Sequence, residues 1–211
     1  MHSWLIHFLN RAFVTWLHNE EKTTDKTIII CPSYSLLPEA KALLKEHKTS
    51  VPIFLGSQSV SPFEEGAHTG EETARTLSDL VKYTLIGHSE RRADFGETDE
   101  IIAQKVAMAH TYNIEPILCV QGIKTPVPEG VRIVAYEPSF AIGTGNAETP
   151  EEVNEVAAFF KEEKNILYVL YGGSVTEANV GKFTKMEYIN GILVGGASLD
   201  PQAFSEIVKN A

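Results

Sequence analysis

Short apolar runs that alternate with longer amphipathic stretches constrain the fold of this chain more than any other feature. Seven runs are short and almost wholly apolar, which predicts buried β-strands. They are Thr27–Cys31, Pro52–Leu55, Thr84–Gly87, Pro116–Val120, Val131–Tyr136, Leu167–Tyr171 and Gly191–Val194. Most lack the polar alternation of a sheet with one wet face, and this pattern is typical of parallel strands that are covered on both faces.

Helical stretches separate most of the runs. They cover about residues 36–47, 70–82, 97–112, 149–163, 176–184 and 200–209. The stretch after Thr149 begins with Pro150, Glu151 and Glu152, which suits the first turn of a helix and its positive end. Alternating strands and helices predict an α/β fold with a parallel sheet. The 211 residues contain no linker, so we expect a single domain over 1–211.

Composition excludes several classes of function. The chain is 43% hydrophobic and 22% charged, as in soluble globular proteins, and no apolar run approaches the roughly 20 residues of a membrane span. A net charge of −10 argues against nucleic acid and anionic membranes as partners. The apolar start lacks the features of a secretory signal, and Cys31 and Cys119 lie within strand-like runs. We therefore expect a cytoplasmic protein with reduced thiols.

The rhythm breaks between Val120 and Val131. The segment Gln121–Gly130 contains two prolines and two glycines, which leaves no room for a packed helix. A crossover between parallel strands normally needs about a dozen residues or more. We therefore expect a crossover that lacks its helix.

One acidic residue lies where a general base could work. The sequence of residues 135–145 is Ala-Tyr-Glu-Pro-Ser-Phe-Ala-Ile-Gly-Thr-Gly. A buried strand delivers Glu137 to the mouth of a site, beside a loop with Pro138 and two glycines that could close over it and exclude water. The alternative is an acidic residue in an ordinary surface turn.

Three other strand ends carry polar groups or glycines. Gly87-His88-Ser89-Glu90-Arg91-Arg92 could place the His88 imidazole at a helix start, where the dipole favours the neutral, hydrogen-bond-donating form. Alternatively, His88 is a capping or surface residue. Tyr171-Gly172-Gly173-Ser174-Val175 and Gly195-Gly196-Ala197-Ser198 could let backbone amides approach an anion, although glycines at strand ends also serve turn geometry. A phosphate site after the last two strands recurs in (β/α)₈ barrels.

These strings, in this order, resemble the triosephosphate isomerase family. They are Gly-His-Ser-Glu-Arg-Arg, Ala-Tyr-Glu-Pro-x-x-Ala-Ile-Gly-Thr-Gly, Tyr-Gly-Gly-Ser-Val and Val-Gly-Gly-Ala-Ser-Leu. The resemblance implies a contracted (β/α)₈ TIM barrel that lacks the helix between strands five and six. It also implies a glycolytic and gluconeogenic reaction, the interconversion of dihydroxyacetone phosphate and glyceraldehyde 3-phosphate, with no metal or organic cofactor.

The resemblance also implies residue roles. Glu137 would be the base, His88 the neutral electrophile and Glu90 a supporting group. Residues 138–147 would form a lid that begins at Pro138. Ile142 would shield the site, and the phosphate would be bound by backbone amides of Gly143, Ser174, Gly195 and Gly196. Residues 66–71 resemble the family's dimer loop, in which Thr69 would reach a second subunit of a homodimer; the alternative is an ordinary surface turn.

The N-terminus departs from the family, in which the first strand ends in Asn-x-Lys. Aligning Trp4 with the family's tryptophan puts Ser3 and Leu5 at those two positions. A strand over Leu5–Leu9 instead puts Asn10 and Ala12 there, and a third interpretation makes residues 3–20 one amphipathic helix. The first strand is therefore uncertain. No lysine reaches the site in any of these, and Arg11 is the nearest cation.

Losing one preorganised transition-state donor costs about 10²- to 10³-fold in rate. Three hypotheses therefore remain open. The chain could be a slow triosephosphate isomerase, a catalytically silent relative that binds a phosphorylated ligand, or an isomerase of another phosphorylated sugar.

Overall fold

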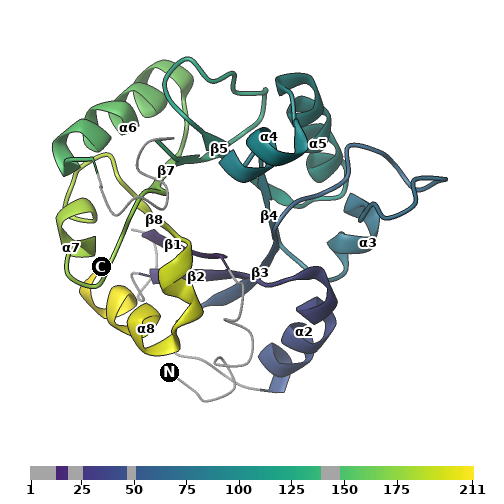
Figure 1. Cartoon of the computed structure of the whole chain (residues 1–211), viewed down its shortest axis with the longest axis horizontal. Coiled ribbons are helices and arrows are strands. Elements are labelled where there is room, and N and C mark those ends of the chain that lie inside the picture. The colour runs from purple at the N-terminus through teal and green to yellow at the C-terminus, as the bar shows by residue number, and fades with distance from the viewer. Residues whose placement is uncertain (1–12, 19–25, 47–50, 139–147) are drawn as a thin grey trace.

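Eight strands form a closed barrel in chain order in the computed structural model, which describes residues 13–18, 26–46, 51–138 and 148–211 (Figure 1). The strands are β1 Phe13–His18, β2 Lys26–Cys31, β3 Ile53–Ser57, β4 Tyr83–Ile86, β5 Glu115–Val120, β6 Ile133–Tyr136, β7 Tyr168–Tyr171 and β8 Gly191–Val194. Strands β2 to β8 are parallel to one another and match the seven predicted runs within one or two residues at most ends. The predicted parallel α/β fold is confirmed.

Helices surround the barrel, as Figure 1 shows. They are α2 Leu37–Glu46, α3 Ala74–Ser78, α4 Ser89–Phe95, α5 Asp99–Thr111, α6 Pro150–Lys164, α7 Val180–Phe183 and α8 Pro201–Asn210, with 3₁₀ turns η1 Tyr34–Leu36 and η2 Gly196–Leu199. Two helices are much shorter than predicted, α3 and α7, and α4 was not among the predicted ranges. None of the described helices is both long and apolar enough to cross a membrane.

Two local predictions are confirmed. Residues 121–132, between β5 and β6, form bends, turns and irregular chain without a helix, and β6 is still parallel to β5. Helix α6 begins after Thr149, whose side chain accepts a hydrogen bond from the Glu152 amide while the Glu152 carboxylate accepts from the Thr149 amide, a complete capping box. The predicted start of this helix was therefore correct.

Strand β1 runs against both of its neighbours. Phe13 pairs with Cys31 and His18 pairs with Lys26, while Val14 pairs with Val194 of β8. Residues 19–25 are too few for a crossover, so an antiparallel hairpin is the connection that the chain length permits. The helix predicted over residues 3–20 is therefore wrong, whereas the strands proposed within residues 1–12 lie outside the described residues.

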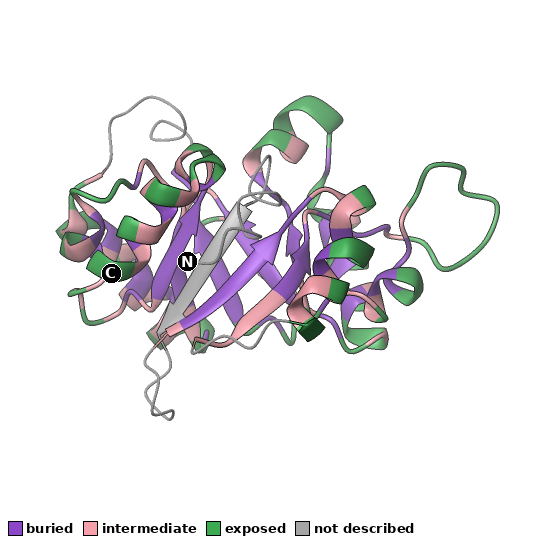
Figure 2. Ribbon diagram, turned by 90° about the horizontal axis from the view of Figure 1, so that it is seen from below, coloured by how far each residue is buried: buried purple, intermediate pink, exposed green. Residues whose placement is uncertain are grey.

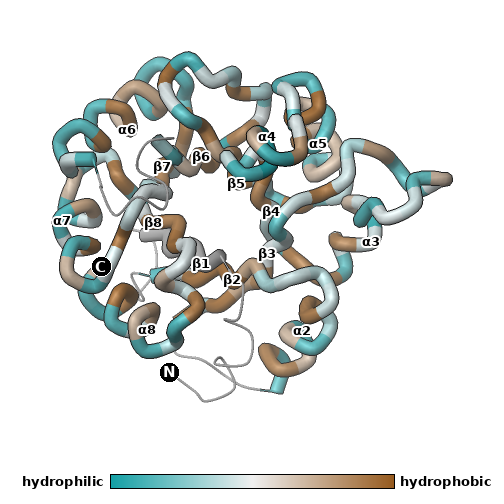
Figure 3. Tube along the Cα trace, in the orientation of Figure 1, coloured by the Kyte–Doolittle hydropathy of each residue, from teal (hydrophilic) through white to brown (hydrophobic). Residues whose placement is uncertain are grey.

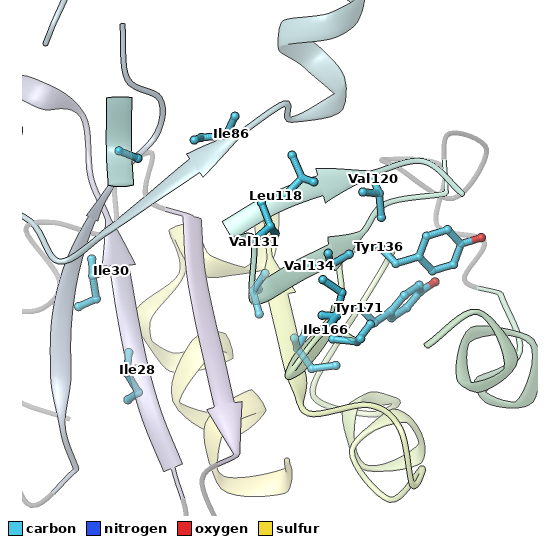
Figure 4. Packing of buried hydrophobic residues seen from close by; sticks show 14 of the residues in the cluster. Ile28, Ile30, Ile86, Leu118, Val120, Val131, Val134, Tyr136, Ile166 and Tyr171 are labelled. Atoms are coloured by element: carbon cyan, nitrogen blue, oxygen red, sulfur yellow. The ribbon is translucent and has the colours of Figure 1, made fainter. Parts of the chain in front are cut away.

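The core has two layers, because successive strand side chains point to opposite faces. Ile133 and Ala135 of β6 belong to the cluster that fills the barrel, with Ile29, Cys31, Leu85, Ile117, Cys119, Leu170 and Leu193. Val134 and Tyr136 belong to the larger cluster between the strands and the helices (Figure 4). Figure 3 shows hydrophobic residues concentrated along the strands. Burial on both faces explains why the strand sequences lack polar alternation.

Candidate active site

Two predicted functional groups meet at the carboxyl ends of the parallel strands. Glu137 directly follows β6, and its amide donates to the Val120 carbonyl at the end of β5 (2.8 Å). His88 lies just beyond β4. The His88 Nε2 atom is 3.1 Å from Oε1 of Glu137, and these residues are only 7% and 1% exposed. The structure therefore rules out Glu137 as an acidic residue in a surface turn and places it in a buried pair.

Helix α4 orients this pair. His88 is its N-cap residue, and the Nδ1 atom accepts a hydrogen bond from the Glu90 amide (3.4 Å). The amide of Ser89, the first residue of α4, donates to Oε2 of Glu137 (3.1 Å). A free amide at a helix start is an expected partner for a carboxylate. The sequence suggested a helix start at His88, although the predicted helices did not include α4, and nothing in it indicated the bond from Ser89 to Glu137.

The direction of the His88 pKa shift differs from the expectation based on the helix dipole. Because Nδ1 accepts a hydrogen bond, the neutral ring carries its proton on Nε2, which donates to Glu137. Burial lowers the pKa of His88, but the hydrogen bond and the negative charge of Glu137 outweigh it, with a smaller contribution from Glu90. The pKa of His88 is therefore raised above its ordinary value, because the effect of the Glu137 carboxylate exceeds that of burial.

The residues predicted to bind phosphate follow the last two strands, at the same end of the barrel as Glu137. Ser174 comes shortly after β7, and its carbonyl accepts from the Asn179 side chain (3.1 Å). Gly195 follows β8, and its carbonyl accepts from the amide and the hydroxyl of Ser198 (2.8 and 2.6 Å). Gly196 begins η2. The carboxyl ends of β4, β6, β7 and β8 thus converge on one face.

Known proteins were compared with this chain. Residues 7–211 match the family described as Triosephosphate isomerase. The triosephosphate isomerase of Dictyoglomus thermophilum is 38% identical, over 88% of this chain and 86% of that protein. That of Carboxydothermus hydrogenoformans is 38% identical over 87% and 85%, and that of Thermus thermophilus 36% identical over 86% and 84%. This chain belongs to the triosephosphate isomerase family.

The family resemblance also assigns roles to Glu90, Pro138, Ile142 and Gly143. The Glu90 side chain is 63% exposed, and its Oε2 is 3.7 Å from Nδ1 of His88, too far for a hydrogen bond. Pro138 is buried directly after Glu137. Ile142 and Gly143 lie outside the described residues.

Thr69 lies in a segment between β3 and α3 that projects from the barrel (Figure 2). The Ser61 amide donates to the Glu72 carbonyl (2.9 Å) and closes the base of this segment. Residues 63–71 are exposed, and the Phe63 ring, 46% exposed, stacks on His68 with 4.2 Å between ring centroids. The segment is therefore an exposed projection with an accessible aromatic ring.

Sequence analysis missed two residues that touch Glu137. A Cβ atom on Gly172 would lie 2.8 Å from Cγ of Glu137, so the glycine leaves room for the carboxylate side chain. Cys119 of β5 lies inside the barrel, and the pKa of its thiol is raised well above the ordinary value by burial, then by the charge of Glu137 and a hydrogen bond to it. The Gly172-Gly173 pair was the only sequence signal for the contact with Glu137, and it was interpreted as part of an anion site.

Two tyrosines hold Glu148 just before helix α6. The Tyr136 hydroxyl donates to Oε1 of Glu148 (3.1 Å), and the Glu148 amide donates to the Tyr171 hydroxyl (3.2 Å). The two tyrosines lie side by side on β6 and β7 (Figure 4). Burial raises the pKa of Glu148, although the Tyr136 bond opposes it. No sequence signal marked this cluster.

Within the described residues, no three His, Cys, Asp or Glu side chains are grouped so that they could hold a metal ion.

Proposed function

We propose that this protein is a triosephosphate isomerase that interconverts dihydroxyacetone phosphate and glyceraldehyde 3-phosphate, with Glu137 as the base and His88 as the electrophile. One observation carries the proposal. In a chain of this family, the 3.1 Å contact between His88 Nε2 and Glu137 Oε1 joins a carboxylate and an imidazole in a site from which water is largely excluded.

Substrate must first separate this pair, because their hydrogen bond occupies the atoms that would act on it. The substrate carbonyl oxygen then accepts a hydrogen bond from the Nε2–H group of His88. The Glu137 carboxylate moves next to the neighbouring carbon. Ser89 also releases the carboxylate in this step, since its amide holds Oε2 in the structure. Binding energy therefore converts a resting hydrogen bond into the reacting arrangement.

Proton transfer follows from these positions. Glu137 removes a proton from the carbon beside the carbonyl, and the resulting enediolate carries negative charge on its oxygens. His88 donates to these oxygens, and its donation is strong because the surroundings are dry. The Nε2 atom of His88 gives its proton to the former carbonyl oxygen and takes the proton of the neighbouring hydroxyl, which becomes the new carbonyl. Glu137 returns a proton to the former carbonyl carbon, and the isomerisation is then complete without any other reactant.

The substrate phosphate would lie beyond β7 and β8. Backbone amides of Gly143, Ser174, Gly195 and Gly196 are proposed to bind it, and the lid from Pro138, with Ile142, to cover the site. Glu90 would act on the Nδ1 side of His88. The clustering of strand ends supports this arrangement, since successive backbone amides suit phosphate recognition.

The reversed direction of β1 bears on the rate. In the family the first strand ends in a lysine motif, but here the carboxyl end of β1, at His18, pairs with the first residue of β2, at the opposite end from Glu137. The end of β1 therefore cannot supply a cation to the site. We expect activity reduced by about 10²- to 10³-fold relative to a site with all its donors.

A homodimer in the cytoplasm is also proposed. The projecting segment with Thr69 and Phe63 offers an exposed, partly aromatic surface to a second copy. Family resemblance supports this use of the segment.

A coupled assay of glyceraldehyde 3-phosphate isomerisation tests the function. The purified protein should be active, Glu137→Gln should abolish the activity, and Glu155→Gln, the same change at an exposed position of α6, should leave it intact. Equal rates in wild type and Glu137→Gln, or no activity in either, would contradict the catalytic proposal and favour a silent relative that binds a phosphorylated ligand.

A further inference from the structure

A cavity of about 470 Å³ opens at the other end of the barrel from Glu137 and His88. It is lined by Lys82 before β4, Glu115 at the start of β5, and Arg132 before β6, together with His110, Asn113 and Gly130. Arg132 directly precedes β6 and Glu137 directly follows it, so about 17 Å of strand separates the cavity from the active site. The cavity is therefore a distinct place on the molecule.

The shortened connection between β5 and β6 helps to form this cavity. The described residues 121–132 contain no helix, and Gly130, near the end of this connection, contributes backbone to the cavity wall. Gly130 has φ +83°, and a Cβ atom there would lie 2.9 Å from Cε1 of His110, so a larger residue would be strained and would press on this wall. On the other side, α5 ends and Asn113 turns the chain with φ 56°.

The charge of the cavity is opposite to that of the whole chain. Lys82 and Arg132 are cations, whereas Glu115 is the one acidic residue in the lining. The net charge of the chain is −10. A small anion would therefore meet locally favourable charge here.

Much of the cationic hydrogen-bonding capacity is unused. Arg132 binds Glu115 through Nε (3.3 Å) and Nη2, and within the described residues its Nη1 makes no hydrogen bond. The Lys82 ammonium lies 4.9 Å from the centre of the Phe54 ring and forms no ion pair with described residues. Arginine presents a planar fork that suits oxyanions, and lysine adds a mobile point charge.

We infer that this cavity binds a small oxyanion with at least two negative charges, held by Lys82 and Arg132. Its volume lies within the range of about 300–1,000 Å³ that is usual for small-molecule sites. Phosphate-bearing and polycarboxylate metabolites share the required chemistry. The inference does not depend on isomerase activity, because none of these residues belongs to the proposed catalytic machinery.

Calorimetric titration with inorganic pyrophosphate and, separately, citrate tests this inference and distinguishes the two anion classes. Lys82→Gln should weaken binding about three- to fivefold, as expected for one exposed charge, and Arg132→Gln about tenfold. Glu115→Gln should tighten binding, because it removes the acidic group from the cavity. Lys45→Gln, at an exposed lysine of α2, is the control and should bind the anion with the affinity of the wild type.

The Glu115→Gln variant controls for misfolding, because a protein that had lost its structure could not bind the anion more tightly. Absence of binding by wild type would overturn the inference. Unchanged affinity in both Lys82→Gln and Glu115→Gln would also overturn it, because binding would then occur elsewhere, such as at the active site.

Discussion

Strands β1 and β6 each occupy one position in the same closed barrel, but they run in opposite directions. Strand β6 follows a connection of residues 121–132, which is just long enough to return the chain and keep β6 parallel to β5. Strand β1 is joined to β2 by residues 19–25, which only an antiparallel hairpin accommodates. The length of a connection thus decides the direction of a strand.

The direction of a strand in turn decides whether its carboxyl end lies at the Glu137–His88 end of the barrel. Strand β6 ends where β4 ends, and so it delivers Glu137 to His88. Strand β1 ends at His18, beside Lys26 at the amino end of β2. The family's first-strand lysine is therefore lost through topology as well as through sequence.

The largest effect is expected near the His88–Glu137 pair, in a buried network beside α4. Lys105 is 3% exposed, and its Nζ binds Glu97 Oε1 (2.5 Å) and the Ser59 hydroxyl (2.8 Å), while Arg91 binds the same carboxylate. Lys105→Met should lower the free energy of unfolding by about 3–5 kcal/mol, because it removes one partner of a buried ion pair. Urea denaturation measures this.

Lys185→Met, at an exposed lysine after α7, is the matched control and should change stability by less than about 0.5 kcal/mol. Similar losses in the two variants would contradict the view that a buried network holds the side of the barrel that carries His88.

The register of β1 can be tested by cross-linking. Phe13 pairs with Cys31, so Phe13→Cys should form a disulfide with the native thiol under oxidation and stabilise the protein by about 3 kcal/mol. Leu17→Cys pairs with Thr27 and should remain reduced. Thiol titration and thermal unfolding with and without reductant measure both. A disulfide in Leu17→Cys instead would contradict the register of β1 against β2.

Gly172 tests how closely β7 must approach Glu137. Gly172→Ala places a Cβ atom 2.8 Å from Cγ of Glu137 and should displace the carboxylate, lowering kcat/KM by about 10²-fold. Gly122→Ala, whose added Cβ atom meets nothing within 4 Å, should be nearly unchanged. If the two alanine variants have equal activity, the close approach of β7 does not position Glu137 for activity.

The smallest effect is a pH dependence. The pKa of His88 is raised in the folded protein, so its protonation contributes stability below the ordinary pKa of about 6.5. This contribution is lost as the pH rises through the raised pKa. The free energy of unfolding of wild type minus that of His88→Gln should therefore fall over this range in chemical denaturation. A difference that stays constant, or grows with pH, would contradict the His88–Glu137 interaction.

Sequence patterns predicted the features that depend on local repetition, which are the strands, and the residues placed at the strand ends. Continuous apolar runs identified the parallel strands, and Glu137 and His88 were singled out just after two of them, whereas their use in one site was implied only by the family resemblance. The contact between Gly172 and Glu137 depends on the register of β6 against β7, which no local pattern specifies. The direction of β1 depended on recognising Phe13–His18 as the strand, and this run was obscured by other apolar residues around it.

Isomerisation of glyceraldehyde 3-phosphate in D₂O, followed by proton NMR, tests the central claim most directly, because it observes the proton that Glu137 is proposed to carry. Wild type should turn over the substrate and incorporate deuterium at the carbon that receives the proton, whereas Glu137→Gln should do neither. Equal turnover and deuterium incorporation in the two proteins would contradict the assignment of Glu137 as the base.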